Sequence, residues 1–288
     1  MGSFLFTNPG SGSYARKRIA TALNFLHVHG IMPTVYTVRT PAEAQACCNA
    51  MYTITDQPLV IIAAGDGTIN AVINGLLPGS ATLAILPLGT SNVLAAELGI
   101  CSLADGLARI ISGTPRELCL GRLQMEHAGY RFALMAGIGF DGAVVRDLRA
   151  GEKRLLRQGG YLLSALRNCL TWETARLDVR TPAQQLNCHT AVVCNASRYG
   201  GNFVMAPETD VFTPGLAVAC LTGRQRRSYL AAAFDLLRGS AGASNHIQRI
   251  CADQVTVTGA KPIQIDGDFV GYGPAELMNE TGVCRVMA

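Results

Sequence analysis

The chain has 288 residues, of which 49% are hydrophobic and 15% are charged. This composition argues against collagen, coiled coil and disorder, and it predicts a folded protein with a substantial core. The length corresponds to two domains of roughly 150 residues each. The formal net charge is only +4, whereas a dedicated nucleic-acid-binding protein carries a dense set of Lys and Arg residues. We therefore expect no nucleic-acid partner.

The ten cysteines are scattered and form no CxxC pair, so we expect reduced, mostly buried thiols. The N-terminal residues lack the pattern of a signal peptide. No segment approaches the ~18 apolar residues that a membrane-spanning helix needs. We therefore expect a cytoplasmic protein that does not span a membrane, and the sequence does not indicate its oligomeric state.

The first 120 residues alternate strand-like and helix-like segments, which predicts a parallel sheet in an α/β domain. The predicted strands are Ser3 to Thr7, Thr34 to Val38, Leu59 to Ala63 and Leu83 to Leu86. The predicted helices are Tyr14 to His29, Thr40 and Pro41 through Met51, and Thr68 to Leu77.

Beyond Thr114 the apolar pattern changes to a period of two, which predicts antiparallel sheets. The segments concerned are Arg176 to Arg180, His189 to Cys194, Leu216 to Leu221 and Val255 to Ile265. Helical stretches are expected at Glu152 to Leu170 and Arg226 to Leu237. We predict domains at 1–120 and 121–288 with a soft boundary, and we leave open whether the final C-terminal segment packs back onto the first domain.

A Gly-Asp-Gly-Thr turn, Gly65 to Thr68, joins a buried strand to a helix. Unpaired N–H groups and the helix dipole favour an anion at such a position, and glycine lets a phosphate approach the backbone. Asp66 would repel a bare phosphate, but it is suited to a hydrated Mg²⁺ or to ordering a nucleotide. The alternative is a tight turn in which Asp66 only caps a helix.

Two further turns repeat this arrangement. Gly89, Thr90, Ser91 and Asn92 follow the next strand, and Asn8, Ser11 and Gly12 follow the first strand, just before a helix with Arg16 and Arg18. Turns at the carboxyl ends of neighbouring strands face one crevice. The chain contains no GxxxxGK[ST] loop, so amides and hydroxyls, rather than a P-loop lysine, would meet the phosphates.

Gly137, Gly139 and Gly142 also match the dinucleotide-binding pattern GxGxxG. That pattern requires an acidic residue at the end of a second strand about 20 residues later, where this chain has a basic helical stretch. We therefore do not favour a Rossmann site here.

The motifs NPGSG, AAGDGT, PLGTSNVLA, GIGFDG, NASRYGGNFVMAP and IDGD follow one another in this order across nearly the whole chain. This succession resembles the diacylglycerol kinase catalytic-domain family, the bacterial lipid kinases related to diacylglycerol, sphingosine and ceramide kinases. The resemblance implies an α/β nucleotide-binding domain like those of phosphofructokinase and NAD kinase, followed by a mainly antiparallel β-sandwich domain that carries lipid. The implied activity transfers the γ-phosphoryl group of Mg-ATP to the hydroxyl of diacylglycerol or a related neutral lipid.

The resemblance also implies roles for individual residues. The ATP contacts would be Asn8, Thr40, Gly65, Asp66, Gly67, Thr68, Asn70, Gly89 and Thr90, and Asp66 would lie near the Mg²⁺. The general base of the family is a carboxylate in a DGE motif, which here reads Asp266, Gly267 and Asp268, so Asp268 becomes the candidate base. Without the resemblance, the residues favour a plain hairpin turn at this position.

The chain departs from the family pattern at several positions. Ala64 replaces the first glycine of GGDGT, and Ala71 and Val93 stand where the family often has carboxylates, which predicts a thinner magnesium-water network. Asp268 is one methylene shorter than glutamate. Pro214 replaces an aspartate of a structural Mg²⁺ loop, so we expect no metal there.

A lipid kinase without a membrane span must reach the bilayer surface. The stretch from Arg146 to Arg167 interleaves basic and apolar residues and is our candidate for peripheral contact with the inner face of the membrane. A solvated helix face is an equally good interpretation of this stretch and of the cluster at Arg224, Arg226 and Arg227. Trp172 suits a core or an interface.

Two other functions stay open. Because two carboxylates are missing, the protein could be a regulatory member that binds nucleotide and lipid with little turnover. A soluble-substrate kinase such as NAD kinase shares GDGT, but the asparagine-acid pair and the serine-threonine loop of that family are not found in this sequence.

Overall fold

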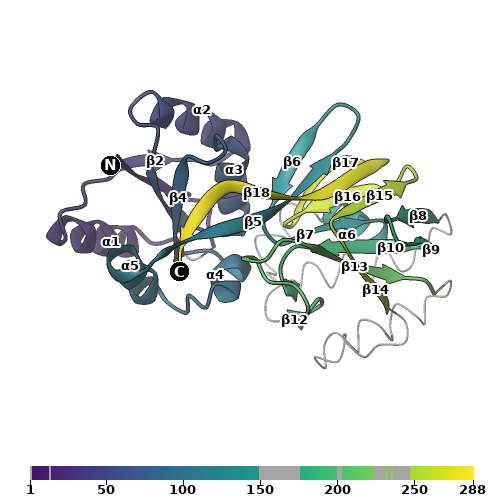
Figure 1. Ribbon diagram of the computed structural model, residues 1–288. Helices are drawn as coiled ribbons and strands as arrows, with labels where there is room; N and C mark the ends of the chain where they lie inside the picture. The colour runs from purple at the N-terminus through teal and green to yellow at the C-terminus, as the bar shows by residue number, and fades with distance from the viewer. Residues whose placement is uncertain are drawn as a thin grey trace. The chain divides into compact units, whose positions relative to one another are not determined.

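Figure 1 shows a computed structural model of the chain, which describes residues 2–12, 14–148, 176–199, 203–223 and 247–288, with residues 231 and 235. The chain divides into two compact units. The first contains Met1–Cys119 and Thr281–Ala288, and the second contains Leu120–Glu280. The helices expected at Glu152 to Leu170 and Arg226 to Leu237 lie outside the described residues, apart from 231 and 235, as does Trp172.

The first unit is built from alternating strands and helices around a parallel sheet. Its elements are β1 (Ser3–Thr7), α1 (Arg16–Val28), β2 (Thr34–Thr37), α2 (Pro41–Tyr52), β3 (Leu59–Ala64), α3 (Asp66–Gly75), β4 (Ala81–Pro87), α4 (Val93–Glu97) and α5 (Leu103–Ser112). The strand order is β2-β1-β3-β4-β18, where residues 284–286 of β18 (Ala275–Met287) pair in parallel with β4. The strands β5 (Pro115–Gln124) and β18 each have residues in both units.

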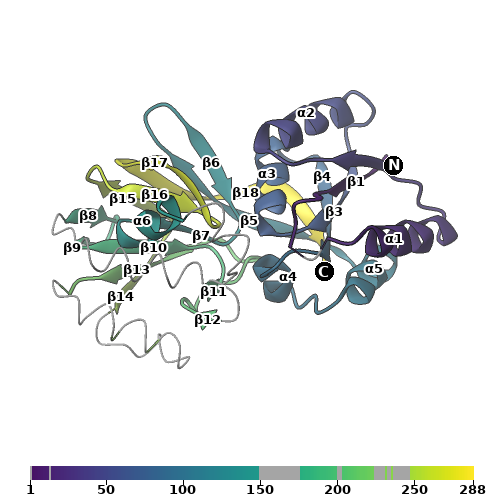
Figure 2. The ribbon, with the colours of Figure 1, turned by 180° about the vertical axis from the view of Figure 1, so that it is seen from behind.

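Helices cover both faces of this sheet. Leu5, Ile61 and Leu86 share one face and pack against α1 and α5, as the core of Leu5, Ile19, Ala22, Leu26, Ile61, Ala63, Ala84, Leu86, Leu88, Leu107 and Ile110 shows. The alternate strand residues, including Phe6 and Ile62, point to the opposite face and are buried there. Figures 1 and 2 both show α1 with α5 on one side of the sheet and α2 with α3 on the other.

The second unit contains short strands in antiparallel pairs. Its elements are the remainder of β5, β6 (Gly129–Phe132), β7 (Met135–Ile138), α6 (Phe140–Arg146), β8 (Leu177–Arg180), β9 (Gln185–Cys188), β10 (Thr190–Cys194), β11 (Arg198–Tyr199), β12 (Phe203–Val204), β13 (Leu216–Leu221), β14 (Ile247–Ala252), β15 (Gln254–Thr258), β16 (Pro262–Ile265), β17 (Asp268–Tyr272) and the first half of β18. One sheet has the order β14-β13-β10-β7-β16-β17. The second joins β18, β15, β8 and β9, with β5 and β6 beside them.

The two sheets of this unit share one core. Residues such as Ile138 and Val193 from the six-stranded sheet and Val179 and Leu277 from the other are almost fully buried in it. Inward and outward side chains alternate along the strands, which is the pattern of a β-sandwich. The predicted fold class, an α/β domain followed by a mainly antiparallel β-sandwich domain, is therefore confirmed.

Several predicted elements have observed bounds that differ by one or two residues, and one predicted strand is divided. The run Val255 to Ile265 is not one strand, because it divides into β15 and β16, which belong to different sheets. Gly259 lies between them with a φ of +117°, a conformation that side chains disfavour, so the chain can leave one sheet for the other there. The helix expected from Thr68 to Leu77 begins two residues earlier, at Asp66, and ends at Gly75.

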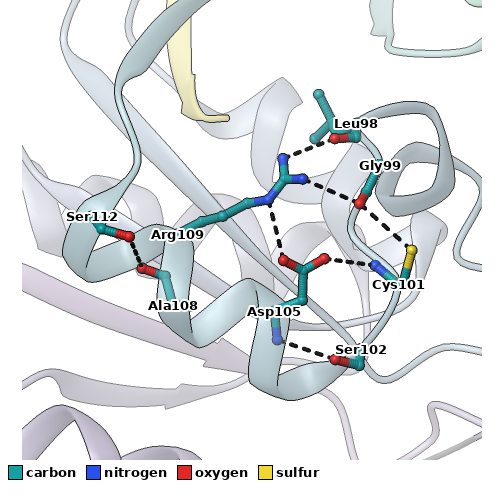
Figure 3. A network of polar contacts seen from close by, with 8 residues as sticks. All are labelled: Leu98, Gly99, Cys101, Ser102, Asp105, Ala108, Arg109 and Ser112. Carbon is teal, nitrogen blue, oxygen red and sulfur yellow. Dashed lines mark hydrogen bonds and ion pairs between the residues drawn. The ribbon is translucent and has the colours of Figure 1, made fainter.

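A polar network fixes the connection from α4 to α5 (Figure 3). The guanidinium of Arg109 donates to the carbonyl oxygens of Leu98, at 2.8 Å, and Gly99, at 3.1 Å, and pairs with Asp105 at 3.6 Å. Asp105 in turn accepts the N–H of Cys101, and Ser102 caps α5 by accepting the N–H of Asp105. The network satisfies carbonyl groups at the end of α4, so it holds the short helix that follows the Gly89 turn.

In the described part of the chain, no helix combines the length and the apolar character needed to cross a bilayer. Of the predicted membrane-contact stretch, only residues 146–148 are described, and there the guanidinium of Arg146 donates to both carboxylate oxygens of Asp147. The rest of that stretch and the arginines at 224, 226 and 227 lie outside the described residues.

The buried parallel sheet should control the stability of the first unit. Ile61 is 0% exposed at the centre of this sheet, whereas Ile54 is 63% exposed in the loop after α2. We expect Ile61→Ala to lower the free energy of unfolding by about 2–5 kcal/mol, because it removes core contacts and leaves a cavity. The same substitution at Ile54 should change it by less than about 0.5 kcal/mol. Urea denaturation followed by circular dichroism measures both, and equal losses would contradict the assignment of the core.

Candidate functional site

The parallel sheet has a switch point between β1 and β3, which are adjacent strands. The helix that follows β1 covers one face of the sheet and the helix that follows β3 covers the other, as Figure 2 shows. In open α/β sheets such a switch point opens a crevice outside the carboxyl ends of the strands, and ligands bind there. The Asn8 and Gly65 turns stand at the two sides of this position.

Side chains of the first turn link it to the other two. The side-chain amide of Asn8 donates to the hydroxyl of Thr68 over 3.1 Å, and its oxygen accepts the N–H of Gly10 over 2.8 Å. The Ser11 hydroxyl donates to the carbonyl of Leu88 over 2.7 Å. The three glycine-bearing turns predicted to converge are thus joined in one cluster.

Glycine is required where the Gly65 and Gly89 turns meet. A Cβ at Gly89 would lie 2.3 Å from the Cα of Gly65 and 2.6 Å from the side-chain oxygen of Asn92. A Cβ at Gly12 would lie 2.0 Å from the hydroxyl oxygen of Thr90. The second and third turns therefore pack backbone against backbone, and the first turn packs against the side chain of Thr90.

Asn92 shapes the third turn. It has left-handed backbone angles, φ 50° and ψ 48°, which asparagine tolerates better than most residues. Its side-chain oxygen accepts the N–H of Gly89 over 2.6 Å, and its amide donates to the Gly89 carbonyl over 3.1 Å. These two bonds close the turn on itself and fix the orientation of the Gly89 peptide.

Asp66 joins the second turn to the third. Its carboxylate oxygens accept the N–H groups of Val93 and Leu94, over 3.0 and 3.1 Å, at the start of α4. Burial raises the pKa of Asp66 above its ordinary value, while backbone N–H donors, with Leu94 and Val93 first, oppose that rise. The alternative interpretation of Asp66 as a helix cap is therefore correct in part, although the helix it caps is α4 rather than its own. The backbone N–H groups of Asn92 and of Asp66 itself also bond to this carboxylate.

The other predicted residues are distributed less tightly. Thr40 caps α2 by accepting the N–H of Glu43 over 3.2 Å, and it is exposed at the end of the neighbouring strand β2. Gly67 is exposed in the first turn of α3, whereas Asn70 is buried one turn later, where its carbonyl and side-chain oxygens accept from Asn74. The structure brings Asn8, Gly65, Asp66, Thr68, Gly89 and Thr90 together.

Sequence reasoning missed one further polar group in this region. Thr7 is the last residue of β1, directly before Asn8, and it is 3% exposed. Its hydroxyl oxygen is the one buried side-chain oxygen or nitrogen in the described part of the chain that has no hydrogen-bond partner. Buried hydroxyls seldom stay unpaired. A threonine directly before a polar turn was the available signal, but strand residues of this kind are usually structural.

The candidate base lies in the second unit, at a hairpin between β16 and β17. Asp266 and Gly267 form its two-residue loop with φ of 47° and 88°, the backbone that a tight hairpin requires. The Asp266 carboxylate accepts the N–H groups of Ala133, Leu134 and Met135 over 2.8, 3.0 and 2.9 Å. Asp268 follows as the first residue of β17 and is exposed. The hairpin interpretation of this segment is confirmed, and it is compatible with a functional Asp268.

Comparisons with known proteins agree with this architecture. Residues 3–123 match the family model described as diacylglycerol kinase catalytic domain, and residues 135–288 match that of the YegS C-terminal NAD kinase beta sandwich-like domain. The chain is 25% identical over 281 residues to a diacylglycerol kinase of Bacillus subtilis (strain 168), covering 94% of this chain and 91% of the relative. It is 30% identical over 184 residues to a Pseudomonas putida KT2440 protein named "Probable lipid kinase YegS-like", covering 62% and 60% of the two chains.

A crystal structure of a diacylglycerol kinase from Bacillus anthracis str. Sterne has the same fold, with a TM-score of 0.77 at 20% identity over 99% of this chain and 96% of that chain. The two family models together cover nearly all of the sequence, in the order in which the two structural units occur. The chain therefore belongs to the lipid kinase family in which a diacylglycerol kinase catalytic domain precedes a YegS C-terminal NAD kinase beta sandwich-like domain.

Proposed function

We propose that this lipid kinase transfers the γ-phosphoryl group of Mg-ATP to the hydroxyl of diacylglycerol or a related neutral lipid. The observation that carries the proposal is the cluster of three glycine-bearing turns at the switch point of the parallel sheet. Backbone N–H groups, hydroxyls and a helix N-terminus are the groups that hold a triphosphate where no P-loop lysine is present.

The residues present fit a nucleotide. Gly65, Gly89 and Gly12 let the three turns approach one another closely, and Gly67 is exposed in the first turn of α3, whose dipole favours an anion. Asn8 and Thr90 supply an amide and a hydroxyl, and the unpaired Thr7 hydroxyl lies next to Asn8 in the chain. Arg16 and Lys17 stand exposed at the start of α1, after the first turn, and add positive charge.

The residues also fit a Mg²⁺ ion that reaches the protein through water and phosphates. Asp66 offers carboxylate oxygens, the ligands this ion prefers, but no three His, Cys, Asp or Glu side chains gather into a ligand set within the described ranges. Ala71 and Val93 supply no carboxylate. When bound, Mg²⁺ neutralises charge that develops on the phosphates. Asp66, held by the amides of α4, would orient the water around it.

Asp268 would act as the general base. Its exposed carboxylate accepts the proton of the lipid hydroxyl while that oxygen forms a bond to the γ-phosphorus. The bond from the γ-phosphorus to its bridging oxygen breaks at the same time, and ADP leaves. The hairpin clamp at Asp266 supports this role, because a base is effective only when its geometry is fixed.

The acceptor can be tested with the purified chain, Mg-ATP and vesicles made from a total lipid extract. We expect mass spectrometry to find a phosphorylated neutral lipid, with diacylglycerol as the first candidate. Parallel reactions with ceramide and with NAD separate the other acceptor classes. If every lipid stays unmodified while NAD gains a phosphate, the protein is a soluble-substrate kinase and the proposal is wrong. Nucleotide binding with co-purified lipid but no transfer would favour the regulatory function, which the missing carboxylates at Ala71 and Val93 support.

The base assignment predicts a selective loss of turnover. Asp268→Asn should lower kcat by roughly 10²- to 10⁴-fold, because an amide cannot accept the proton at this step. The dissociation constant for ATP, measured by calorimetry, should stay within about twofold of the native value. Asp253→Asn is the matched control, since Asp253 is another exposed aspartate of the same unit, and it should retain native kcat. Native turnover by the Asp268→Asn protein would remove the assignment.

The turn cluster predicts an effect on nucleotide binding. Gly89→Ala places a methyl group against the backbone of Gly65, so the two turns must separate. We expect ATP affinity to fall at least tenfold, in line with the sensitivity of positioned phosphate sites to small displacements. Gly129→Ala is a control, because the atoms nearest to its methyl group would belong to the flexible side chain of Gln124 in the second unit. Unchanged ATP affinity in a folded Gly89→Ala protein would contradict the placement of the phosphates.

A further inference from the structure

The motif GIGFDG has a packing role in the second unit. Gly137 lies on β7, Gly139 precedes α6 with a φ of +92°, and Gly142 lies within α6. A Cβ at Gly142 would lie 2.1 Å from the carbonyl oxygen of Pro262 on β16. A Cβ at Gly137 would lie 1.7 Å from a carboxylate oxygen of Asp141. The glycines therefore let α6 lie directly on β7 and β16 and make room for the Asp141 side chain.

Asp141 is a buried carboxylate that the proposed reaction does not use. It is 9% exposed, and it accepts hydrogen bonds from the Tyr199 hydroxyl and from the side-chain amide of Gln264, the latter over 2.7 Å. Burial raises the pKa of Asp141 above its ordinary value, and the bonds from Tyr199 and Gln264 oppose the rise. Since a buried carboxylate is often no more stabilising than an apolar side chain, its presence needs a reason other than stability.

Gln264 connects Asp141 to the hairpin that carries Asp268. The side-chain nitrogen of Gln264 donates to Asp141, while its side-chain oxygen accepts the N–H of Gly267 over 2.8 Å. Gly267 is the residue directly before Asp268. Gln264 is itself 3% exposed on β16, and the pairing of β16 with β17 shifts register between Ile263 and Gln264. Such irregularities re-aim side chains next to functional sites.

We propose that Asp141 is a positioning residue for Asp268 and acts through Gln264. This inference rests on the proposed function, in which Asp268 is the base. A glutamine amide can turn by 180°, and either orientation fills the same space. The Asp141 carboxylate can only accept, so it holds the nitrogen of Gln264 on its own side. The oxygen of Gln264 then faces the N–H of Gly267.

Asp266 and Gln264 both contribute to holding the hairpin loop. Asp266 binds the amides of Ala133 to Met135, and Gly267 is bound through Gln264 to Asp141. If the bond from Gln264 to Gly267 is lost, Asp266 still binds the amides of Ala133 to Met135. The hairpin would therefore still form, but the position of Asp268 would be less well fixed. We therefore expect loss of Asp141 to reduce the rate of phosphoryl transfer much more than the binding of ATP.

The first test compares two substitutions of similar shape. Asp141→Leu removes the acceptor, and it should lower kcat by roughly 10- to 100-fold with the KM for Mg-ATP unchanged. Asp141→Asn can still accept from Gln264 and donate to Tyr199, so it should restore kcat to within about threefold of native. Val218→Ala, a buried change on β13 in the same sheet, controls for general destabilisation and should retain native kcat per folded molecule. Equal kcat values for Asp141→Leu and Val218→Ala would overturn the inference.

A double-mutant cycle separates positioning from a purely structural role. In an Asp268→Asn background there is no base left to position, so adding Asp141→Leu should reduce the residual rate by less than about twofold. A further loss of the full 10- to 100-fold would mean that Asp141 acts independently of Asp268, which contradicts the proposal. If Asp141→Leu does not fold, Gln264→Met replaces it in the cycle, because it keeps the length of the side chain and removes both hydrogen bonds.

Hydrogen exchange tests the same link without an activity assay. We expect the Gly267 amide to exchange roughly fivefold faster in Asp141→Leu, the equivalent of one lost hydrogen bond, and at the native rate in Asp141→Asn. Unchanged exchange in both variants would overturn the inference whatever the enzyme phosphorylates. If the native protein phosphorylated no lipid but Gly267 responded as expected, the proposed function would fail while the positioning of the hairpin by Asp141 would stand.

Discussion

The arrangement of the first unit depends on the contact between the backbones of Gly65 and Gly89. Turns at the ends of adjacent parallel strands are separated by the spacing of the sheet, and a side chain at either glycine would force them apart. Glycine makes the contact possible but leaves the loops conformationally free, which costs entropy on folding. Asp66 and Asn92 counter that freedom, since both use side-chain oxygens to fix N–H groups of the third turn. The outcome is a set of rigid turns at a sheet switch point beside the N-terminus of α3, a position that suits an anionic ligand without a lysine loop.

The second unit applies the same physical principle to a different task. Glycines at 137 and 142 bring α6 onto β7 and β16, and the space they release is occupied by a carboxylate. Asp266 binds three backbone amides, and Asp141 reaches a fourth through Gln264. In both units a carboxylate, Asp66 or Asp266, accepts backbone N–H groups that have no partner within regular secondary structure. Without these bonds the N–H groups would be costly to bury.

Much of this could be predicted from local pattern. The alternation of strands and helices up to β4, the three glycine turns and the hairpin at Asp266 and Gly267 all depend on residues close together in the chain. The contacts that define the sites do not. Asp66 reaches α4 across 27 positions and Gln264 reaches Asp141 across 123, and no periodicity records such a pairing. The division of the run from Val255 to Ile265 into two sheets at Gly259 was missed for the same reason, because both halves have the same period of two.

Two departures from the family pattern concern the proposed reaction: the carboxylates missing at Ala71 and Val93, and the shorter side chain of Asp268. Both make the fixed positions of the remaining carboxylates more important. In the proposed reaction Ala71 and Val93 supply no carboxylate, so Asp66 would have fewer partners with which to order water around a metal ion, and its own orientation, fixed by α4, would matter more. Asp268 is shorter than glutamate by one methylene, so its carboxylate has less reach and fewer rotamers with which to correct an error of position. A short base held on a hairpin can still be effective if the hairpin itself does not move, since rigidity of the backbone then replaces adaptability of the side chain. The bonds from Asp266 and Gln264 to the backbone on both sides of that loop supply this rigidity.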